Sequence, residues 1–428
     1  MVSESKREKI IALINREVVP AIGCTEPVAV ALCVAKATEL LGVLPARIEV
    51  ALSGNMLKNA MGVGIPGTGM IGLPIAMALG ALVGKSSYGL EVLKDVTPEA
   101  VELGSRYISE GRIVISHDEK APSKLHVDVT VTDDDGGNTA RAVISCEHTH
   151  FILLQKNGET ILSEEATGDA AENSDDIALD LATVYEFATE TPVDEISFIL
   201  EAKRLNMAAA ETALSGDYGH SLGATIRNCG LKYYGDTPVE HMISYTSAAC
   251  DARMGGAPVA VMSNSGSGNQ GITATMPVVS FAADMEAGEE QTIRALILSH
   301  LTSIYIKQSL GRLSALCGCV VASTGASAAI VYLMGGGFSE VCSAVKNMVA
   351  NLTGMICDGA KPSCALKISS GVSTAMMSAM LAMNGKCVSS AEGIISEDVD
   401  ATIHNLTSIG REAMNETDRL VLQIMTSK

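Results

Sequence analysis

Leu125-His-Val-Asp-Val-Thr-Val131 and Ala140-Arg-Ala-Val-Ile-Ser-Cys146 are two segments of alternating apolar residues, joined across Asp133-Asp-Asp-Gly-Gly137. Alternation with a period of two predicts β-strands with one buried face, and the Asp-Gly run predicts a hairpin turn between them. Three neighbouring segments, 112–116, 151–155 and 159–162, also have strand composition, with Lys156-Asn-Gly158 as a second turn. The stretch therefore predicts a small antiparallel β module.

Helical patterns dominate on both sides of this module. A helix is expected from Thr25-Glu-Pro27 to about Leu41, because Pro suits a first helical turn and Gly42 follows. A short strand is expected at 48–52. Helical periods return after residue 177 in five stretches, which are 193–213, 291–310, 339–352, 363–383 and 392–425.

The predicted fold class is therefore α+β, with a mainly helical catalytic body interrupted by the β module. We expect residues 1–95 to form the N-terminal part of the helical body. Residues 96–165 are expected to form the antiparallel module, and residues 177–428 the rest of the helical body. The acidic stretch Ser163 to Asp176 is expected to be an exposed linker.

The composition limits the classes of partner. A formal net charge of −19 argues against nucleic acid and anionic membrane surfaces, since both would be repelled. The eleven cysteines and the charged N-terminus without a signal peptide predict a reducing cytoplasmic location. The Ala- and Met-rich helices are compatible with a homodimer.

Three long stretches carry no charge, at 59–84, 254–283 and 313–339. Their length suits a membrane span, so a transporter is one alternative. Each stretch is interrupted by Gly, Ser, Thr, Asn or Pro, which favours buried helices and loops around an interior site instead.

Four cysteines near the C-terminal end are candidate metal ligands. They are Cys317 and Cys319 in Cys-Gly-Cys, and Cys357 and Cys364, seven positions apart. Thiolates on loops between helices can hold a metal or an iron–sulfur cluster. The spacing matches neither ferredoxin nor zinc-finger runs, so buried structural thiols are the alternative.

Cys24 stands directly before the predicted helix at Thr25. A thiol at a helix N-terminus meets free amide hydrogens and the positive end of the dipole, so we expect its pKa to be lowered. A small residue in a turn is the alternative reading.

Cys146, His148 and His150 form a competing metal candidate. In a strand these residues would share one face. Half-buried strand residues explain the same pattern, because Ile144 and Ile152 continue that face.

Three glycine-containing loops offer donors for an anion. They are Ser53-Gly-Asn55, Gly266-Ser-Gly-Asn-Gln-Gly271 and Ser215-Gly-Asp-Tyr-Gly-His220. Backbone amides in such loops suit a carboxylate or phosphate, but the Lys-Ser/Thr ending of a nucleotide loop is missing. Structural turns are the alternative, and for the loop at His220 a surface turn is favoured.

Taken together, these motifs resemble those of the L-cysteine desulfidase family, which is related to the α-chain of iron–sulfur L-serine dehydratases. The resemblance covers nearly the whole chain. It rests on Gly23-Cys-Thr-Glu-Pro27, Ser53-Gly-Asn55, Ser267-Gly-Asn-Gln-Gly271, Cys317-Gly-Cys319 and the run from Gly354 to Lys367. Serine dehydratases usually place the last two cysteines further apart, so the shorter loop here favours the desulfidase branch.

The resemblance implies a [4Fe–4S] cluster held by Cys317, Cys357 and Cys364, with one iron open to a small amino acid. It implies elimination of sulfide from L-cysteine to give pyruvate and ammonia, with Cys24 as the base. Substrate-binding candidates are Asn55, Ser267, Asn269, Gln270 and Lys361. The alternatives are dehydration of L-serine by the same cluster, or a non-catalytic iron–sulfur sensor or binding protein.

Overall fold

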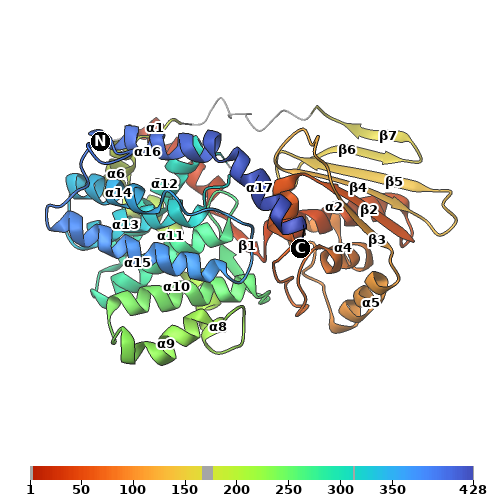
Figure 1. The fold of residues 1–428 in the computed structure, drawn as a ribbon, viewed down its shortest axis with the longest axis horizontal. Helices are drawn as coiled ribbons and strands as arrows, with labels where there is room; N and C mark the ends of the chain where they lie inside the picture. The colour runs from red at the N-terminus through yellow and green to blue at the C-terminus, as the bar shows by residue number, and fades with distance from the viewer. Residues whose placement is uncertain (1–2, 166–176, 312–313, 428) are drawn as a thin grey trace.

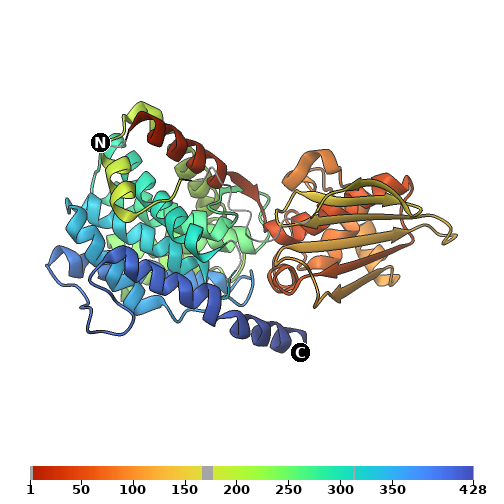
Figure 2. The same ribbon diagram turned by 90° about the horizontal axis from the view of Figure 1, so that it is seen from above.

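The computed structural model describes residues 3–165, 177–311 and 314–427, and it has two lobes that meet over a narrow waist (Figures 1 and 2). Each lobe has its own hydrophobic core. Most of the acidic stretch 163–176 lies outside the described residues. The predicted α+β class with mainly helical structure is confirmed.

The smaller lobe is built on a six-stranded sheet in the order β3-β2-β4-β5-β6-β7. The strands are β2 (Arg47–Leu52), β3 (Ile113–His117), β4 (His126–Thr132), β5 (Thr139–Ser145), β6 (Phe151–Lys156) and β7 (Glu159–Ser163). β2 and β3 pair in parallel, while the other neighbours are antiparallel. The predicted strands and both hairpin turns are confirmed, but the sheet is mixed rather than purely antiparallel.

Helices cover one face of this sheet (Figure 1). They are α2 (Thr25–Leu41), α4 (Leu73–Leu82) and α5 (Pro98–Ser109), with the short elements α3 (Gly54–Ala60) and η1 (Ser86–Glu91) between them. Val127, Val129 and Val131 of β4 are buried toward the helices, as expected for alternating residues. α2 spans the predicted residues and ends at Gly42, whose φ is 88°.

The boundary predicted at residue 95 needs correction. Residues 25–95 were expected to join the helical body, but α2 packs on β4 and β5, and β2 pairs with β4. The apolar face of a sheet must be covered, and the preceding helices supply that cover. Of the helices and strands in the N-terminal region, α1 (Glu4–Glu17) and β1 (Pro20–Ile22) pack with the helical lobe, and the loop residue Val63 also joins its core.

The larger lobe is helical. Its elements are α6 (Leu181–Glu190), α7 (Val193–Ile196), η2 (Ser197–Ile199), α8 (Leu200–Leu214), α9 (Leu222–Tyr233), α10 (Pro238–Met254), β8 (Ala260–Met262), α11 (Gly268–Asp284), α12 (Glu289–Leu310), α13 (Gly318–Leu333), α14 (Phe338–Leu352), α15 (Cys364–Met383), α16 (Val399–Ser408) and η3 (Ile409–Ala413). Small residues allow close packing here: a Cβ on Gly325 of α13 would lie 2.2 Å from the Ser299 carbonyl oxygen of α12.

Two predicted helices of this lobe are interrupted. The stretch 193–213 is divided into α7, η2 and α8, and the stretch 392–425 becomes α16, η3 and α17 (Asn415–Thr426).

By length and composition, α15 is the one described helix that could cross a membrane, and half of its apolar window is buried inside the fold. Core helices of soluble proteins share these properties.

The last helix, α17, leaves the helical lobe and packs against α3 of the sheet lobe (Figures 1 and 2). Leu422 of α17 enters the core of the sheet lobe. Asp418 forms an ion pair with the buried Lys58 and accepts a hydrogen bond from Asn55 Nδ2 at 2.7 Å. The C-terminal helix therefore fastens the two lobes together.

We predict that Asp418→Ala destabilises the protein by about 3 kcal/mol, because it leaves the Lys58 ammonium buried without its counter-ion. The measurement is the midpoint of urea unfolding. Glu416→Gln on the same helix is the matched control, since its ion pair with Arg419 is exposed and screened by solvent, so the urea midpoint should hardly change. An equal effect of the two substitutions would contradict the role given to Asp418.

Candidate active site

Three candidate metal ligands lie around one pocket of about 100 Å³ between the two lobes. Cys317 caps α13, Cys357 lies in the loop after α14, and Cys364 begins α15. The backbone brings two of these segments together: the Cys317 amide donates to the Met355 carbonyl at 3.0 Å, and the Cys357 amide donates to the Ala315 carbonyl at 2.6 Å. The pocket is thus built from residues far apart in the chain.

The loop between Cys357 and Cys364 has a specific backbone requirement. Gly359 has a φ of 93°, in the region that favours glycine, and a Cβ there would lie 2.2 Å from the Lys58 carbonyl oxygen. The glycine therefore lets this loop approach α3 of the sheet lobe. Lys58 Nζ also donates to the Cys357 carbonyl at 3.5 Å.

The thiols influence one another, which places them close together. Burial raises the pKa of Cys357, and the neighbouring Cys317 raises it further, while Lys58 and Lys367 act in the opposite direction. Burial also raises the pKa of Cys364 to about 11, with contributions from Cys317 and Cys357. The hydrogen bond with Cys319, followed by burial, raises the pKa of Cys317.

The chemistry of the trio suits an iron–sulfur cluster, because all three candidate ligands are soft thiols. A single tetrahedral zinc would hold thiolates about 3.8 Å apart, from its bond length of about 2.3 Å. Among the described residues, the only group of three metal-ligating side chains with all ligand atoms within 4.8 Å is Asp236, Glu240 and His241. The three sulfurs are therefore spread more widely, and the nearby Lys58 and Lys367 would offset the negative charge of a thiolate-bound cluster.

The group at Asp236, Glu240 and His241 lies at the start of α10, away from the pocket. His241 Nε2 is 2.7 Å from Asp236 Oδ1, and His241 Nδ1 is 2.9 Å from Asp284 Oδ1. Glu240 also pairs with Arg227 at 2.9 Å. These contacts form an ion-pair network that ties α9, α10 and α11 together.

Cys24 lies in the same pocket, at the N-cap of α2. Its Sγ donates to Glu26 Oε2 at 2.9 Å. The predicted lowering of its pKa is wrong for this structure: burial, and then the Glu26 carboxylate, raise the pKa of Cys24 well above its usual value. Desolvation opposes charge more strongly than the helix end and Arg253 favour it.

Glu26 is ionised although it is buried. Burial alone would raise its pKa, but His148, the hydrogen bond from Cys24 and Arg253 outweigh burial, and the pKa is lowered. Asn59 Nδ2 donates to Glu26 Oε1 at 3.0 Å. The pocket therefore contains a negative charge beside the Cys24 thiol.

The predicted substrate-binding residues divide into two groups. Ser267, Asn269 and Gln270 line the pocket at the start of α11, whereas Asn55 and Lys361 are not among its lining residues. Asn55 donates to Asp418, and Lys361 Nζ pairs with Asp358 Oδ2 at 2.8 Å. Asn55 thus links α3 to α17, and Lys361 holds the loop between Cys357 and Cys364.

Cys146, His148 and His150 do not share a strand face. β5 ends at Ser145 and β6 begins at Phe151, so these residues form the intervening loop, and Cys146 has a φ of 67°. The prediction of a common strand face is wrong because the hairpin turns before residue 146. His148 instead lies near Glu26, as its effect on that carboxyl shows.

Four pocket residues were missed by sequence reasoning: Glu26, Asn59, Arg253 and Lys367. Glu26 lies inside the quoted Gly23–Pro27 motif, which was a usable signal. Lys367 ends the motif from Gly354 to Lys367, which was a second usable signal, whereas Asn59 and Arg253 have no local motif that separates them from ordinary surface residues. Cys250 was also missed; its pKa is raised by burial first and then by Cys364, so it lies beside the trio.

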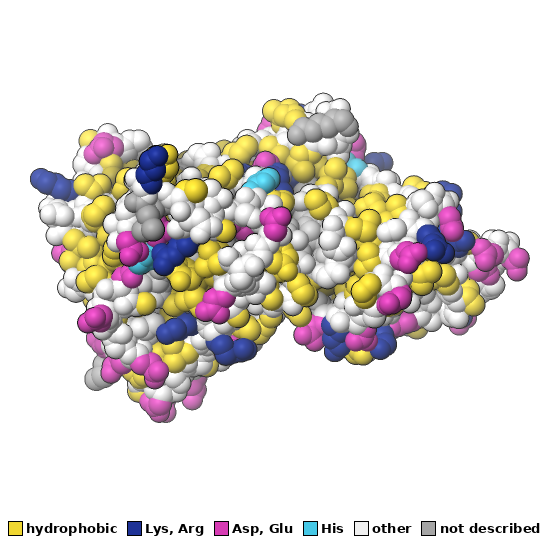
Figure 3. All heavy atoms as spheres, turned by 90° about the horizontal axis from the view of Figure 1, so that it is seen from below, with side chains coloured by type: hydrophobic (Ala, Val, Ile, Leu, Met, Phe, Trp, Pro, Cys, Tyr) yellow, Lys and Arg dark blue, Asp and Glu magenta, His cyan; other side chains and the backbone are white. Residues whose placement is uncertain are grey.

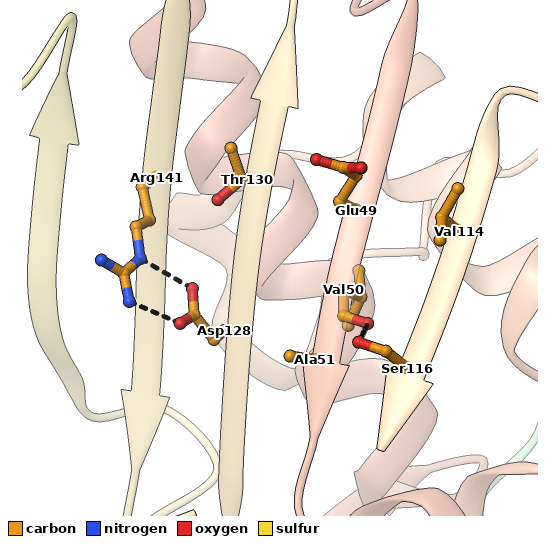
Figure 4. Close-up of a pocket in the computed structure, with 8 residues that line it drawn as sticks. All are labelled: Glu49, Val50, Ala51, Val114, Ser116, Asp128, Thr130 and Arg141. Carbon is orange, nitrogen blue, oxygen red and sulfur yellow. Dashed lines mark hydrogen bonds and ion pairs between the residues drawn. The ribbon is translucent and has the colours of Figure 1, made fainter. Parts of the chain in front are cut away.

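A second hollow lies on the open face of the sheet, lined by Glu49, Val50, Ala51, Val114, Ser116, Asp128, Thr130 and Arg141 (Figure 4). Arg141 and Asp128 form a two-bonded ion pair there, at 2.9 and 2.6 Å. Each of its charged side chains has a partner, since Glu49 pairs with Arg47 at 2.7 Å, and no cysteine lines the hollow. The thiol pocket is therefore the stronger candidate active site.

Seen from below, Lys and Arg side chains are scattered among Asp and Glu over both lobes (Figure 3).

Comparison with known proteins gives consistent matches. The sequence model of the serine dehydratase alpha chain matches residues 87–423. A UPF0597 protein of Phocaeicola vulgatus is 63% identical over 430 residues, covering 100% of this chain and 99% of that protein. One from Bacteroides fragilis is 62% identical with 100% and 99% coverage, and one from Porphyromonas gingivalis is 53% identical with 99% of each chain covered.

We predict that Glu26→Gln lowers the pKa of Cys24, because it removes the carboxylate that opposes the thiolate. Alkylation of Cys24 by iodoacetamide should then begin at lower pH than in the unmodified protein. Mass spectrometry of the Cys24 peptide from cluster-free protein, labelled between pH 7 and 10, measures this. Glu49→Gln on the open sheet face is the control, and an unchanged profile for Glu26→Gln would contradict the assigned contact.

Proposed function

The chain belongs to the serine dehydratase alpha chain family, and from this premise we propose that it is an iron–sulfur lyase that eliminates sulfide from L-cysteine. The observation that supports this proposal is the single pocket lined by Cys24, Cys317, Cys357 and Cys364. A nucleophilic or basic thiol beside a trio of thiol ligands suits β-elimination from a small amino acid.

Cys317, Cys357 and Cys364 are the residues that would hold a [4Fe–4S] cluster. When bound, such a cluster supplies a Lewis-acidic iron for the leaving sulfur atom. Cluster binding requires the three thiols to lose their protons, so their raised pKa values make assembly favourable at higher pH. Cys319 also lines the pocket, but its Sγ donates to the Lys367 carbonyl at 3.0 Å, and we leave it out of the ligand set.

Cys24 is the proposed acceptor of the α-proton. It is a thiol in this structure, so it must lose its own proton before it acts, and Glu26 Oε2 at 2.9 Å is the acceptor that it contacts. A cationic amino group entering the pocket would favour the thiolate by adding positive charge nearby. Burial keeps water from competing for the reacting atoms.

The balanced reaction breaks the Cα–H and Cβ–S bonds of L-cysteine and forms a carbon–carbon double bond. The products are hydrogen sulfide and 2-aminoacrylate, which tautomerises and takes up one water to give pyruvate and ammonia. No external oxidant or reductant is consumed. Pyridoxal phosphate has no part in the proposal.

Dehydration of L-serine is the second candidate, and the name of the matching family favours it. The same residues would act, but hydroxide is a poorer leaving group than sulfide. A soft thiolate also binds iron better than a hydroxyl does. We therefore place L-cysteine first and expect release of sulfide and pyruvate in equal amounts.

We predict that Cys357→Ser abolishes both the cluster and the activity, since one of three ligands is lost. Iron and acid-labile sulfide analysis after anaerobic reconstitution measures the cluster independently of turnover. Cys319→Ser is the matched control and should keep the cluster. Retention of full iron content by Cys357→Ser would contradict the ligand assignment.

We predict that Cys24→Ala keeps the cluster but reduces kcat by at least about 100-fold, the typical contribution of a positioned base. Pyruvate formation from L-cysteine and from L-serine, measured anaerobically, gives the rates. A kcat/KM for L-serine above that for L-cysteine would move the assignment to the dehydratase. Loss of the cluster in Cys24→Ala would make Cys24 a ligand instead.

A further inference from the structure

We propose that the pocket recognises both charged ends of a free α-amino acid, with Arg253 binding the α-carboxylate and the side-chain oxygens of Asn59 and Gln270 binding the α-ammonium group. This inference rests on the proposed function and assigns the recognition of the substrate to residues outside the thiol trio. It is carried by one buried cation that no described carboxylate contacts and by two buried oxygens that receive no hydrogen bond from the described residues.

Arg253 lies in the last turn of α10, and only 3% of it is exposed. Nε donates to the Gly23 carbonyl at 3.1 Å, and Nη1 donates to Asn269 Oδ1 at 3.0 Å. Within residues 3–165, 177–311 and 314–427, no carboxylate oxygen lies within 4.0 Å of its guanidinium, and Nη2 makes no hydrogen bond. A buried guanidinium of this kind requires an anion to complete its environment.

The start of α11 is shaped around Arg253. A Cβ on Gly268 would lie 2.2 Å from Arg253 Nε, so only glycine leaves room for the guanidinium there. Asn269 Oδ1 accepts from Arg253 and holds it in place. The Ser267-Gly-Asn269 motif therefore positions Arg253. This role explains why the motif contains a glycine and an asparagine.

The other cation lining the pocket is not free to bind a carboxylate. Lys367 forms an ion pair with Asp358, and Lys361 pairs with the same carboxylate. Hydrogen bonds with both lysines lower the pKa of Asp358 to about 2 against the effect of burial, so the carboxylate stays charged. Arg253 is thus the pocket cation that has no described carboxylate in direct contact, although the charge of Glu26 acts on it from a longer distance.

Two amide side chains that line the pocket, Asn59 and Gln270, present acceptors. Asn59 uses its Nδ2 to donate to Glu26, and Gln270 uses its Nε2 to donate to Asn264 Oδ1 at 2.9 Å. These donations orient both amides, and they leave Asn59 Oδ1 and Gln270 Oε1 buried without any partner among the described residues. An ammonium group has three donors and no acceptor, so it matches this pair of oxygens.

The charges in the pocket favour binding of the ammonium group of the amino acid beside Asn59. The ionised Glu26 accepts a hydrogen bond from Asn59 Nδ2, which places a negative charge beside the Asn59 amide. Asn59 belongs to the sheet lobe and Arg253 to the helical lobe, so a bound amino acid would connect the two lobes. An amino acid with a blocked amino group or a neutral carboxamide would leave one buried end unsatisfied.

The test uses the reconstituted holoenzyme and L-alanine, which has no leaving group and cannot react. Isothermal titration calorimetry under anaerobic conditions compares L-alanine with L-alaninamide and N-acetyl-L-alanine. For the unmodified enzyme we expect L-alanine to bind at least about 10-fold more tightly than either blocked form. Arg253→Gln should weaken L-alanine binding by about 10- to 100-fold and change L-alaninamide binding by less than about 3-fold.

Asn59→Leu tests the other end: it should weaken L-alanine binding and leave N-acetyl-L-alanine unchanged. Arg204→Gln is the matched control, because Arg204 is exposed on α8 and pairs with Glu201. If Arg253→Gln does not fold, as judged by circular dichroism, Arg253→Lys replaces it and should still weaken L-alanine binding by losing the fixed fork of donors.

Two results would overturn the inference: no measurable binding of L-alanine to the unmodified enzyme, or unchanged L-alanine affinity in the folded Arg253 and Asn59 variants. This binding test can succeed or fail independently of the test of the lyase proposal. If neither L-cysteine nor L-serine is turned over but the preference for unblocked L-alanine depends on Arg253 and Asn59, the lyase proposal fails and the recognition site stands.

Discussion

The structure depends on charges that are buried where the two lobes meet. Lys58 and Glu26 belong to the sheet lobe, and Arg253 belongs to the helical lobe, yet all three are almost fully excluded from solvent. A buried charge is tolerated only with hydrogen bonds or a counter-charge, so each lobe constrains the other. Asp418 of the C-terminal helix provides the counter-charge for Lys58. The lobes have separate cores, and these polar contacts set how they fit together.

That junction is also where the chemistry is assembled. Cys24 comes from the sheet lobe, while Cys317, Cys357 and Cys364 come from loops and helix starts of the helical lobe. Loops at helix ends can place thiols toward a common point without disturbing the helices behind them. A pocket shared between lobes also lets the proposed base and the proposed cluster approach a substrate from different sides. Packing alone requires neither a buried Arg253 without a contacting carboxylate nor the unpartnered oxygens of the pocket, which is why we connect them to substrate binding.

Predictions from local pattern succeeded where short-range physics dominates. The strand alternation of Val127, Val129 and Val131 and the bounds of the helix at 25–41 were read correctly, because burial period and turn residues act locally. Grouping residues 25–95 with the helical body failed, because which helix covers which sheet face is a long-range choice. The predicted direction of the Cys24 pKa shift was also wrong, since a sequence shows the helix end but not the depth of burial or the position of the Glu26 carboxylate.

The sequence by itself determined the class of fold, the positions of most helices and strands, and a set of thiols with the motifs of a known family. Only the tertiary structure decided which groups share a pocket: it brought Arg253 and Asn59 to the thiols and directed Asn55 and Lys361 to other partners. The physical reason is that propensity and hydrophobic period depend on near neighbours in the chain. Desolvation and charge compensation depend instead on neighbours in space, and those neighbours are hundreds of residues apart in this molecule.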